Sequence, residues 1–291
     1  MDGLKLQTPV EAGLSKVSIS LKDKIFVLGS CFADNIGRKM VDLGFDVCVN
    51  PFGTIYNPVS ICNSIARLAS GIPFSEDECV PMGAGAGLVC SFSHHTSFAR
   101  RTEGEFLNVA NASLEEASRR WKAATKVIIT LGTAWIYEYS RTGEVVSNCL
   151  KIDAKEFSRR RLSIRETAML LMNMIARHPD KEFIFTVSPI RHLKDGAHGN
   201  QLSKSTLLLA LDEVLAKFPD RCDYFPAYEI VLDELRDYRF YSPDMVHPSE
   251  QAVDYLWNRF VGFAVPASEL PDLEERRKEF LCSRHRPINI R

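Results

Sequence analysis

Two short stretches of the sequence carry residue types suited to nucleophilic catalysis. Ser30 follows Gly29 at the end of an apolar run, and Asp244 stands three residues before His247. A carboxylate can hold the Nδ1–H of an imidazole, which leaves Nε2 free to accept a proton. A serine whose proton is removed in this way can attack a carbonyl carbon and form a covalent intermediate.

Each stretch also has an ordinary structural interpretation. Serine is a common N-cap, and Asp-x-x-His-Pro is compatible with a turn followed by a helix. Cys31 is a second candidate nucleophile, and it is equally compatible with a small buried residue. His94 and His95 with Cys90 suggest metal binding, but no second pair at metal spacing accompanies them in the sequence. We therefore favour a turn or strand position for the two histidines and expect no metal and no cofactor.

The residues around Ser30 predict how it is positioned. An apolar run over residues 25–28 indicates a buried strand, and apolar residues at steps of three and four then indicate a helix. Ser30 falls in the turn between them, at the carboxyl end of the strand, where open α/β sheets bind ligands. The free N–H groups of the helix also make an anion or nucleotide site possible, although no glycine-rich phosphate loop is present.

The rest of the chain alternates between strand and helix patterns. Further strands are expected at residues 45–49, 126–131, 182–187 and 224–225, with an antiparallel pair at 135–139 and 144–147. Helices are expected at residues 58–69, 114–125, 164–177, 203–218, 227–235 and 248–263. Ser163 with Glu166 predicts a capping box at the start of the helix at 164–177. This alternation predicts an α/β fold, a three-layer α/β/α sandwich with a doubly wound, mainly parallel sheet. We expect a surface lead-in at 1–23, a single domain at 24–266 and a charged tail helix at 267–291.

Composition narrows the possible partners and compartment. The 291 residues include 45% apolar residues and carry a formal net charge of −1, so no global field favours nucleic acid or a membrane. The basic run at 159–161 is interpreted as a solvated face. The chain has no apolar run of membrane-spanning length, no signal-peptide pattern at its start and eight cysteines without a Cys-x-x-Cys pair. These features predict a soluble cytoplasmic protein with free thiols, and we expect Trp121 and Trp257 in the core.

Taken together, the two chemical stretches resemble the layout of the SGNH hydrolases. The chain is more closely similar to one branch, the GSCFA family, through Gly29-Ser30-Cys31-Phe32-Ala33. The resemblance continues through residues 50–58, 131–135, 188–192, 202–205 and 244–248, so that it covers about residues 20–265. It implies an SGNH-like sandwich with flavodoxin-like strand order.

The resemblance also implies a serine esterase mechanism. Ser30 would attack an acyl carbonyl, His247 would transfer the proton, and Asp244 would fix the imidazole tautomer. The oxyanion hole would use the N–H groups of Ser30 and Gly53 together with a third donor.

That third oxyanion donor is left open among Thr133, Asn57 and Asn148. His192 follows a strand and, with Asn148, is a candidate for substrate binding. The implied substrate is a small-molecule or carbohydrate ester, for hydrolysis or acyl transfer, and the oligomeric state is left open. The alternative is a non-catalytic small-molecule binding module that retains the fold.

Overall fold

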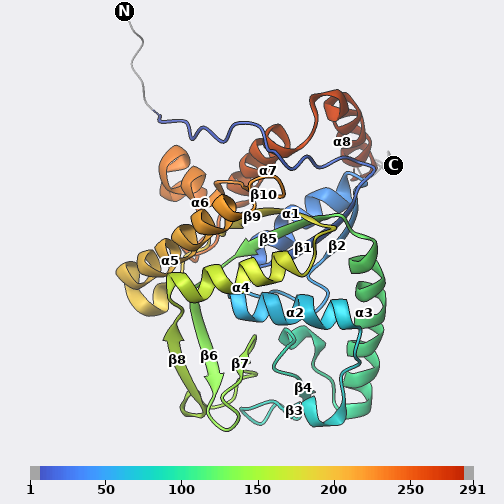
Figure 1. Cartoon of the computed structure of the whole chain (residues 1–291), viewed down its shortest axis with the longest axis vertical. Coiled ribbons are helices and arrows are strands. Elements are labelled where there is room, and N and C mark those ends of the chain that lie inside the picture. The colour runs from blue at the N-terminus through green and yellow to red at the C-terminus, as the bar shows by residue number, and fades with distance from the viewer. Residues whose placement is uncertain (1–6, 285–291) are drawn as a thin grey trace, which may run out of the picture.

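The computed structural model describes residues 7–284 and is built around a five-stranded parallel sheet (Figure 1). Its strands are β1 (Lys24–Gly29), β2 (Asp46–Val49), β5 (Lys126–Leu131), β9 (Glu182–Val187) and β10 (Cys222–Tyr224). They lie in the order β10-β9-β5-β1-β2 and every neighbouring pair is parallel. The predicted parallel α/β architecture is confirmed, and numbering these strands along the chain gives the flavodoxin-like order 2-1-3-4-5.

Helices cover both faces of this sheet. They are α1 (Cys31–Asp42), α2 (Pro58–Ser70), α3 (Glu103–Ala123), α4 (Ile164–Ala176), α5 (Gly196–Lys217), α6 (Ala227–Glu229), α7 (Glu250–Ala264) and α8 (Leu270–Arg284). Successive residues of β1 enter different hydrophobic clusters: Phe26 packs with residues of α2–α5, whereas Val27 packs with residues of α1 and α7. Because side chains alternate across a strand, this shows that both faces of the sheet are buried. Trp121 and Trp257 lie in these two clusters, as predicted.

A separate antiparallel sheet lies beyond one end of the parallel sheet (Figure 1). Its strands are β6 (Trp135–Tyr139), β7 (Val145–Val146) and β8 (Phe157–Arg161), in the order β7-β6-β8. A two-stranded ribbon of β3 (Val80–Pro81) and β4 (Val89–Cys90) adds to this region. Strand β8 contains the basic run, and the interpretation of that run as a solvated face is wrong for Arg159, whose side chain is only 22% exposed.

Two helices begin earlier than predicted. Helix α3 starts at Glu103, where the Thr102 side chain accepts a hydrogen bond from the backbone of Glu105. Phe106 extends its buried stripe by two turns before the predicted start. Helix α5 starts at Gly196, so residues 196–202, before the predicted start, also belong to the helix.

Other boundaries differ by a few residues. The last strand ends at Tyr224, and α7 begins at Glu250 with Ser249 as its cap. The helix predicted at 227–235 is α6 followed by a π-helical segment, Ile230–Leu235. The capping box predicted for Ser163 at the start of α4 is confirmed.

The segment before β1 packs against the domain along α7 (Figure 1). Val17 and Ile19 are fully buried, and the Ile19 N–H donates to the Ala264 carbonyl at 2.8 Å. The expectation of a surface lead-in is therefore wrong for these residues. Residues 1–6 of the predicted lead-in and 285–291 of the predicted tail lie outside the described residues. No helix between residues 7 and 284 is long and apolar enough to cross a membrane.

Candidate functional site

The turn between β1 and α1 holds Ser30 in a buried position. Gly29 has φ +140°, and a Cβ on it would lie 2.2 Å from the Thr130 carbonyl oxygen, so only glycine fits. Ser30 is 1% exposed, and its Oγ accepts a hydrogen bond from the Phe32 N–H at 3.2 Å. Ser30 therefore lies at the carboxyl end of its strand, as predicted, and its hydroxyl acts as the N-cap of α1.

Asn50 is a part of this turn that the sequence patterns did not single out. Its Oδ1 accepts the Gly29 N–H at 2.8 Å, and its Nδ2 donates to Asp34 at 2.6 Å. Burial raises the pKa of the Asp34 carboxyl, against the opposing effect of the bond from Asn50. Asn50 itself has φ +40°, a sparsely populated backbone conformation, which its bonds to Gly29 and Asp34 hold in place.

Asp244 and His247 form the hydrogen-bonded pair that their spacing predicts. Asp244 Oδ2 accepts from His247 Nδ1 at 2.6 Å, and Oδ1 accepts the backbone N–H groups of Val246 and His247. These two backbone bonds, and then the imidazole bond, lower the pKa of Asp244 to about 2. Within residues 7–284, His247 Nε2 has no hydrogen-bond partner. The pair can therefore present a free imidazole nitrogen.

A cavity of about 610 Å³ lies beside this pair. It brings together five of the predicted site residues, which are Asn57, Thr133, Asn148, His192 and His247. Ser30 and Gly53 do not line it, and the described residues include no hydrogen bond between Ser30 and His247. The structure thus gathers His247 and the substrate-binding candidates but does not join Ser30 to them.

Three of the predicted oxyanion donors already have partners. The Gly53 N–H donates to the Asn50 carbonyl at 2.8 Å. The Thr133 N–H donates to the Tyr56 carbonyl at 2.9 Å, and the Thr133 hydroxyl lies 3.0 Å from Ser203 Oγ. The expectation that the Gly53 N–H is an available donor is therefore wrong for this conformation. The Ser30 N–H donates to the Thr130 carbonyl at 3.3 Å, so it is not an available oxyanion donor in this conformation either.

Two asparagine amides on the cavity wall remain as donors. Asn57 caps α2 through Oδ1, and its Nδ2 uses one of two N–H groups on Ser60 Oγ at 3.0 Å. Asn148 accepts the Leu150 N–H on Oδ1 at 2.9 Å, and its Nδ2 has no partner among the described residues. Side-chain amide donors are therefore available where the backbone donors are not.

His192 lies on the cavity wall as a neutral imidazole. Burial, and then the nearby charge of Lys204, lowers the pKa of His192 to about 4. Its Nε2–H donates to the Gly132 carbonyl at 3.1 Å, so Nδ1 is left as an acceptor. Lys204 is fully buried and donates to the carbonyls of Gly132 and Ser188, both at 2.7 Å. It thereby ties together the ends of β5 and β9, and burial lowers its pKa to about 7.

Cys31 is connected to the cavity through a tyrosine. Its Sγ lies 3.5 Å from the Tyr56 hydroxyl, and Tyr56 lines the cavity. Burial, and then its contact with Cys31, raises the pKa of Tyr56 to about 12, so the phenol is neutral. Cys31 is half-buried, whereas Ser30 is fully buried.

Arg191 holds the turn that carries the histidine. Its guanidinium donates to the Met245 carbonyl from Nε at 3.1 Å and from Nη2 at 2.8 Å. Its backbone N–H donates to the Val246 carbonyl at 3.1 Å. Met245 has φ +57°, so the clamp fixes a strained residue between Asp244 and His247. Only the motif at residues 188–192 pointed to Arg191.

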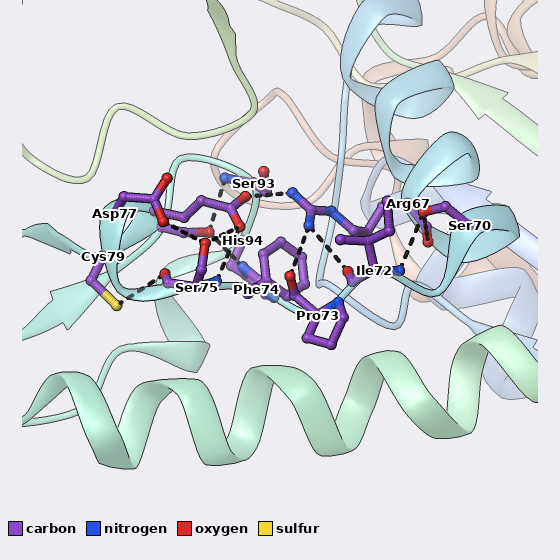
Figure 2. Close-up of polar contacts among 12 residues, drawn as sticks. Arg67, Ser70, Ile72, Pro73, Phe74, Ser75, Asp77, Cys79, Ser93 and His94 are labelled. Carbon is purple, nitrogen blue, oxygen red and sulfur yellow. Dashed lines mark hydrogen bonds and ion pairs between the residues drawn. The ribbon is translucent and has the colours of Figure 1, made fainter.

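A second polar cluster, around His94, lies apart from the cavity. His94 is fully buried, its Nδ1 is 2.7 Å from Ser91 Oγ, and burial lowers its pKa to about 3. Figure 2 shows it beside Phe74 and near Arg67, which donates to backbone carbonyls at 72 and 73. The rings packed on His94 are Phe52, Phe74, Phe98 and Phe106. His94 is therefore a core residue, and residues 7–284 contain no group of three or more metal-binding side chains placed to hold an ion.

The fold and the cavity define a mixed α/β protein with a cavity at the carboxyl ends of its parallel strands. The model of the GSCFA family matches residues 24–260, and the chain belongs to that family. No curated protein matches it. One solved crystal structure aligns with 85% of this chain and 95% of its own length at 16% identity and a TM-score of 0.38. This similarity is too low to assign a fold family or a function.

Proposed function

We propose that this GSCFA protein is an SGNH-type ester hydrolase or O-acyltransferase with His247 as its general base. The observation that supports this most strongly is the 2.6 Å bond between Asp244 and His247 Nδ1, at the wall of a cavity of about 610 Å³. A base oriented by a carboxylate beside a substrate-sized cavity is the arrangement that acyl transfer requires. The substrate class is an acylated carbohydrate or a small acylated metabolite.

Ser30 is the proposed nucleophile. Its Oγ attacks the ester carbonyl while His247 Nε2 takes the hydroxyl proton, and the tetrahedral intermediate then expels the alcohol, which receives that proton. Water or an acceptor hydroxyl removes the acyl group from Ser30 in the second half-reaction. This mechanism requires the hydroxyl to release the Phe32 N–H and turn toward the cavity, because at present it is buried.

The oxyanion would be stabilised by side-chain amides. Asn148 Nδ2 and the second N–H of Asn57 Nδ2 are side-chain amide donors on the cavity wall that have no partner in the described residues. Removal of one such donor typically costs about 3 kcal/mol at the transition state. Backbone donation from Gly53 would first require its bond to Asn50 to break.

Hydrolysis of 4-nitrophenyl acetate tests this proposal. We expect Ser30→Ala and His247→Gln each to lose about two orders of magnitude or more in kcat. Fluorophosphonate labelling should be lost in Ser30→Ala and retained in Cys31→Ala. Labelling lost in Cys31→Ala alone would assign the nucleophile to the cysteine, and equal rates in all variants would exclude the hydrolase.

A non-catalytic binding module is the second candidate function. It is favoured by the burial of Ser30 and by the occupied N–H groups of Ser30 and Gly53. This candidate predicts no hydrolysis by the wild type and ligand binding in the cavity that Ser30→Ala leaves unchanged. Binding that accompanies turnover would contradict it.

A further inference from the structure

One wall of the cavity carries more positive than negative charge. The residues from β6, β8 and the loop at 190–195 include three cations, Arg159, Arg191 and Lys194, and one carboxylate, Asp195. Counting the histidines as neutral, three cations against one carboxylate leave an excess of two positive charges. A concave site of one sign concentrates ligands of the opposite charge.

The single carboxylate is already committed to one of the cations. Arg159 and Asp195 form two parallel hydrogen bonds, and their side chains are only 22% and 14% exposed. The Arg159 guanidinium also stacks 4.3 Å from the Trp135 ring. This pair therefore neutralises itself and forms a rigid part of the wall.

The other two cations have only neutral partners. Lys194 Nζ donates to the Tyr137 hydroxyl at 2.7 Å and lies 5.1 Å from its ring centre. Arg191 uses Nε and Nη2 on the Met245 carbonyl, so the N–H groups of Nη1 remain for a ligand. No carboxylate within residues 7–284 forms an ion pair with either side chain.

The histidine on the same wall lies near a buried cation. His192 has its pKa lowered chiefly by burial and next by the charge of Lys204, whereas Asp195 raises that pKa and Arg159 lowers it to a smaller extent. Lys204 is fully buried behind this wall with carbonyl partners and no carboxylate. A negatively charged ligand group would reduce the repulsion among these positive charges.

We infer that the substrate carries, in addition to its ester, a carboxylate or phosphate group that is bound by Lys194 and Arg191. This deepens the proposed function and rests on it for the ester. Arg191 lies beside the turn that carries His247, and the rings of Trp135 and Tyr137 line the same cavity. Charge-assisted hydrogen bonds to two cations supply both affinity and orientation.

Binding of unreactive amide probes tests the inference without turnover. The probes are N-(4-nitrophenyl)succinamic acid, its neutral primary amide, and the corresponding phosphonate, each titrated by calorimetry. We expect at least one acid to bind about tenfold more tightly than the neutral amide, with a preference that shrinks as salt rises. The tighter of the two acids identifies the carboxylate or the phosphate class. Equal binding of all three probes overturns the inference.

Two variants with the same loss of charge localise the effect. Lys194→Gln should reduce the preference for the acid by about fivefold or more, whereas Lys217→Gln should leave it intact. Lys217 is exposed at the end of α5 and does not line the cavity. An acid preference that survives Lys194→Gln contradicts the assignment.

The two proposals fail in different ways. Tight acid binding by a chain that hydrolyses none of the corresponding 4-nitrophenyl esters would overturn the proposed function and support the anionic subsite. Hydrolysis that depends on His247, combined with equal binding of the acid and its neutral primary amide, would overturn the anionic subsite alone.

Discussion

Asp244 binds His247 twice, once through its imidazole and once through its backbone. Oδ2 accepts from Nδ1 at 2.6 Å, and Oδ1 accepts the His247 N–H at 3.0 Å. The backbone bond fixes the position of the His247 main chain, and the imidazole bond fixes the orientation of its ring. Because an ionised carboxylate only accepts hydrogen bonds, Nδ1 carries the proton and Nε2 is the basic nitrogen.

Asp244→Asn should abolish this control of the tautomer. An asparagine amide can donate to Nδ1, which moves the proton to Nε2 and removes the base, so we expect kcat to fall by about 10²- to 10⁴-fold. Steady-state hydrolysis of 4-nitrophenyl acetate measures the loss. Asp237→Asn is the matched control, since Asp237 also accepts a nearby backbone N–H but has no bond to His247. Equal losses in both variants would show that the effect is structural.

Asp244 also links stability to pH in a defined window. Its folded pKa is lowered from 3.8 to about 2, so its stabilising bonds are fully present above pH 3.8 and are lost as the pH falls through 2. The stability difference between wild type and Asp244→Asn should therefore be constant from pH 5 to 8 and shrink below pH 3.8. Denaturant titrations across that range measure it. A stability difference that changes between pH 5 and 8 would contradict the lowered pKa of Asp244.

Ser30 has a structural role that can be separated from a chemical one. Ser30→Ala removes the N-cap of α1 and should lower the free energy of unfolding by about 1 kcal/mol, whereas Ser30→Gly should cost only a few tenths. Urea denaturation measures both. If Ser30 is the nucleophile, both variants lose hydrolysis despite their different stabilities. Activity that follows stability would assign Ser30 to capping alone.

Arg191 is predicted to be a positioning residue for His247. Loss of its bonds to the Met245 carbonyl in Arg191→Gln frees a strained turn, and we expect kcat for a neutral ester to fall about tenfold while KM changes little. Arg191→Lys should restore part of kcat, because an ammonium can still donate to that carbonyl. Arg165→Gln, at an exposed position on α4, serves as the control. A rise in KM without a fall in kcat would contradict the positioning role.

His94 should make the fold sensitive to mild acid. Its pKa is about 3 in the folded state against an ordinary 6.5, so the unfolded chain binds a proton first and stability falls as the pH drops from 6.5 toward 3. His94→Phe should reduce this slope by up to about 1.4 kcal/mol per pH unit, and the remainder includes His192. Ser91→Ala keeps the imidazole and should keep the slope. Denaturant titrations at pH 4.5 and 7 measure the slope, and an unchanged slope in His94→Phe would contradict the burial argument.

Much of the scaffold could be predicted because it depends on local patterns. The apolar run before Ser30 and the capping box at Ser163 are each encoded within a few residues, and both are found as expected. Strand β8 was missed because only Phe157 of its inward positions is apolar, and the other is Arg159, whose burial depends on Asp195 and Trp135 from other segments. The start of α3 was missed because the cap at Thr102 lies well before the apolar stripe that marked the helix.

The site could be predicted only in part for a similar reason. The Asp244–His247 bond is local, since the two residues are three apart, and its geometry follows from their spacing. The burial of Ser30 and the occupation of the Gly53 N–H depend on how distant segments pack, which no short motif encodes. The cationic wall likewise comes from three separate segments of the chain.

Trapping of the acyl-enzyme tests the central claim most directly. The protein is mixed with 4-nitrophenyl acetate, quenched in acid and digested, and the acetylated peptides are mapped by mass spectrometry. With Ser30 as nucleophile and His247 as base, we predict one acetyl group on the peptide that contains Ser30, present in the wild type and absent in His247→Gln. Acetylation elsewhere, or at Ser30 to the same extent without His247, would contradict it.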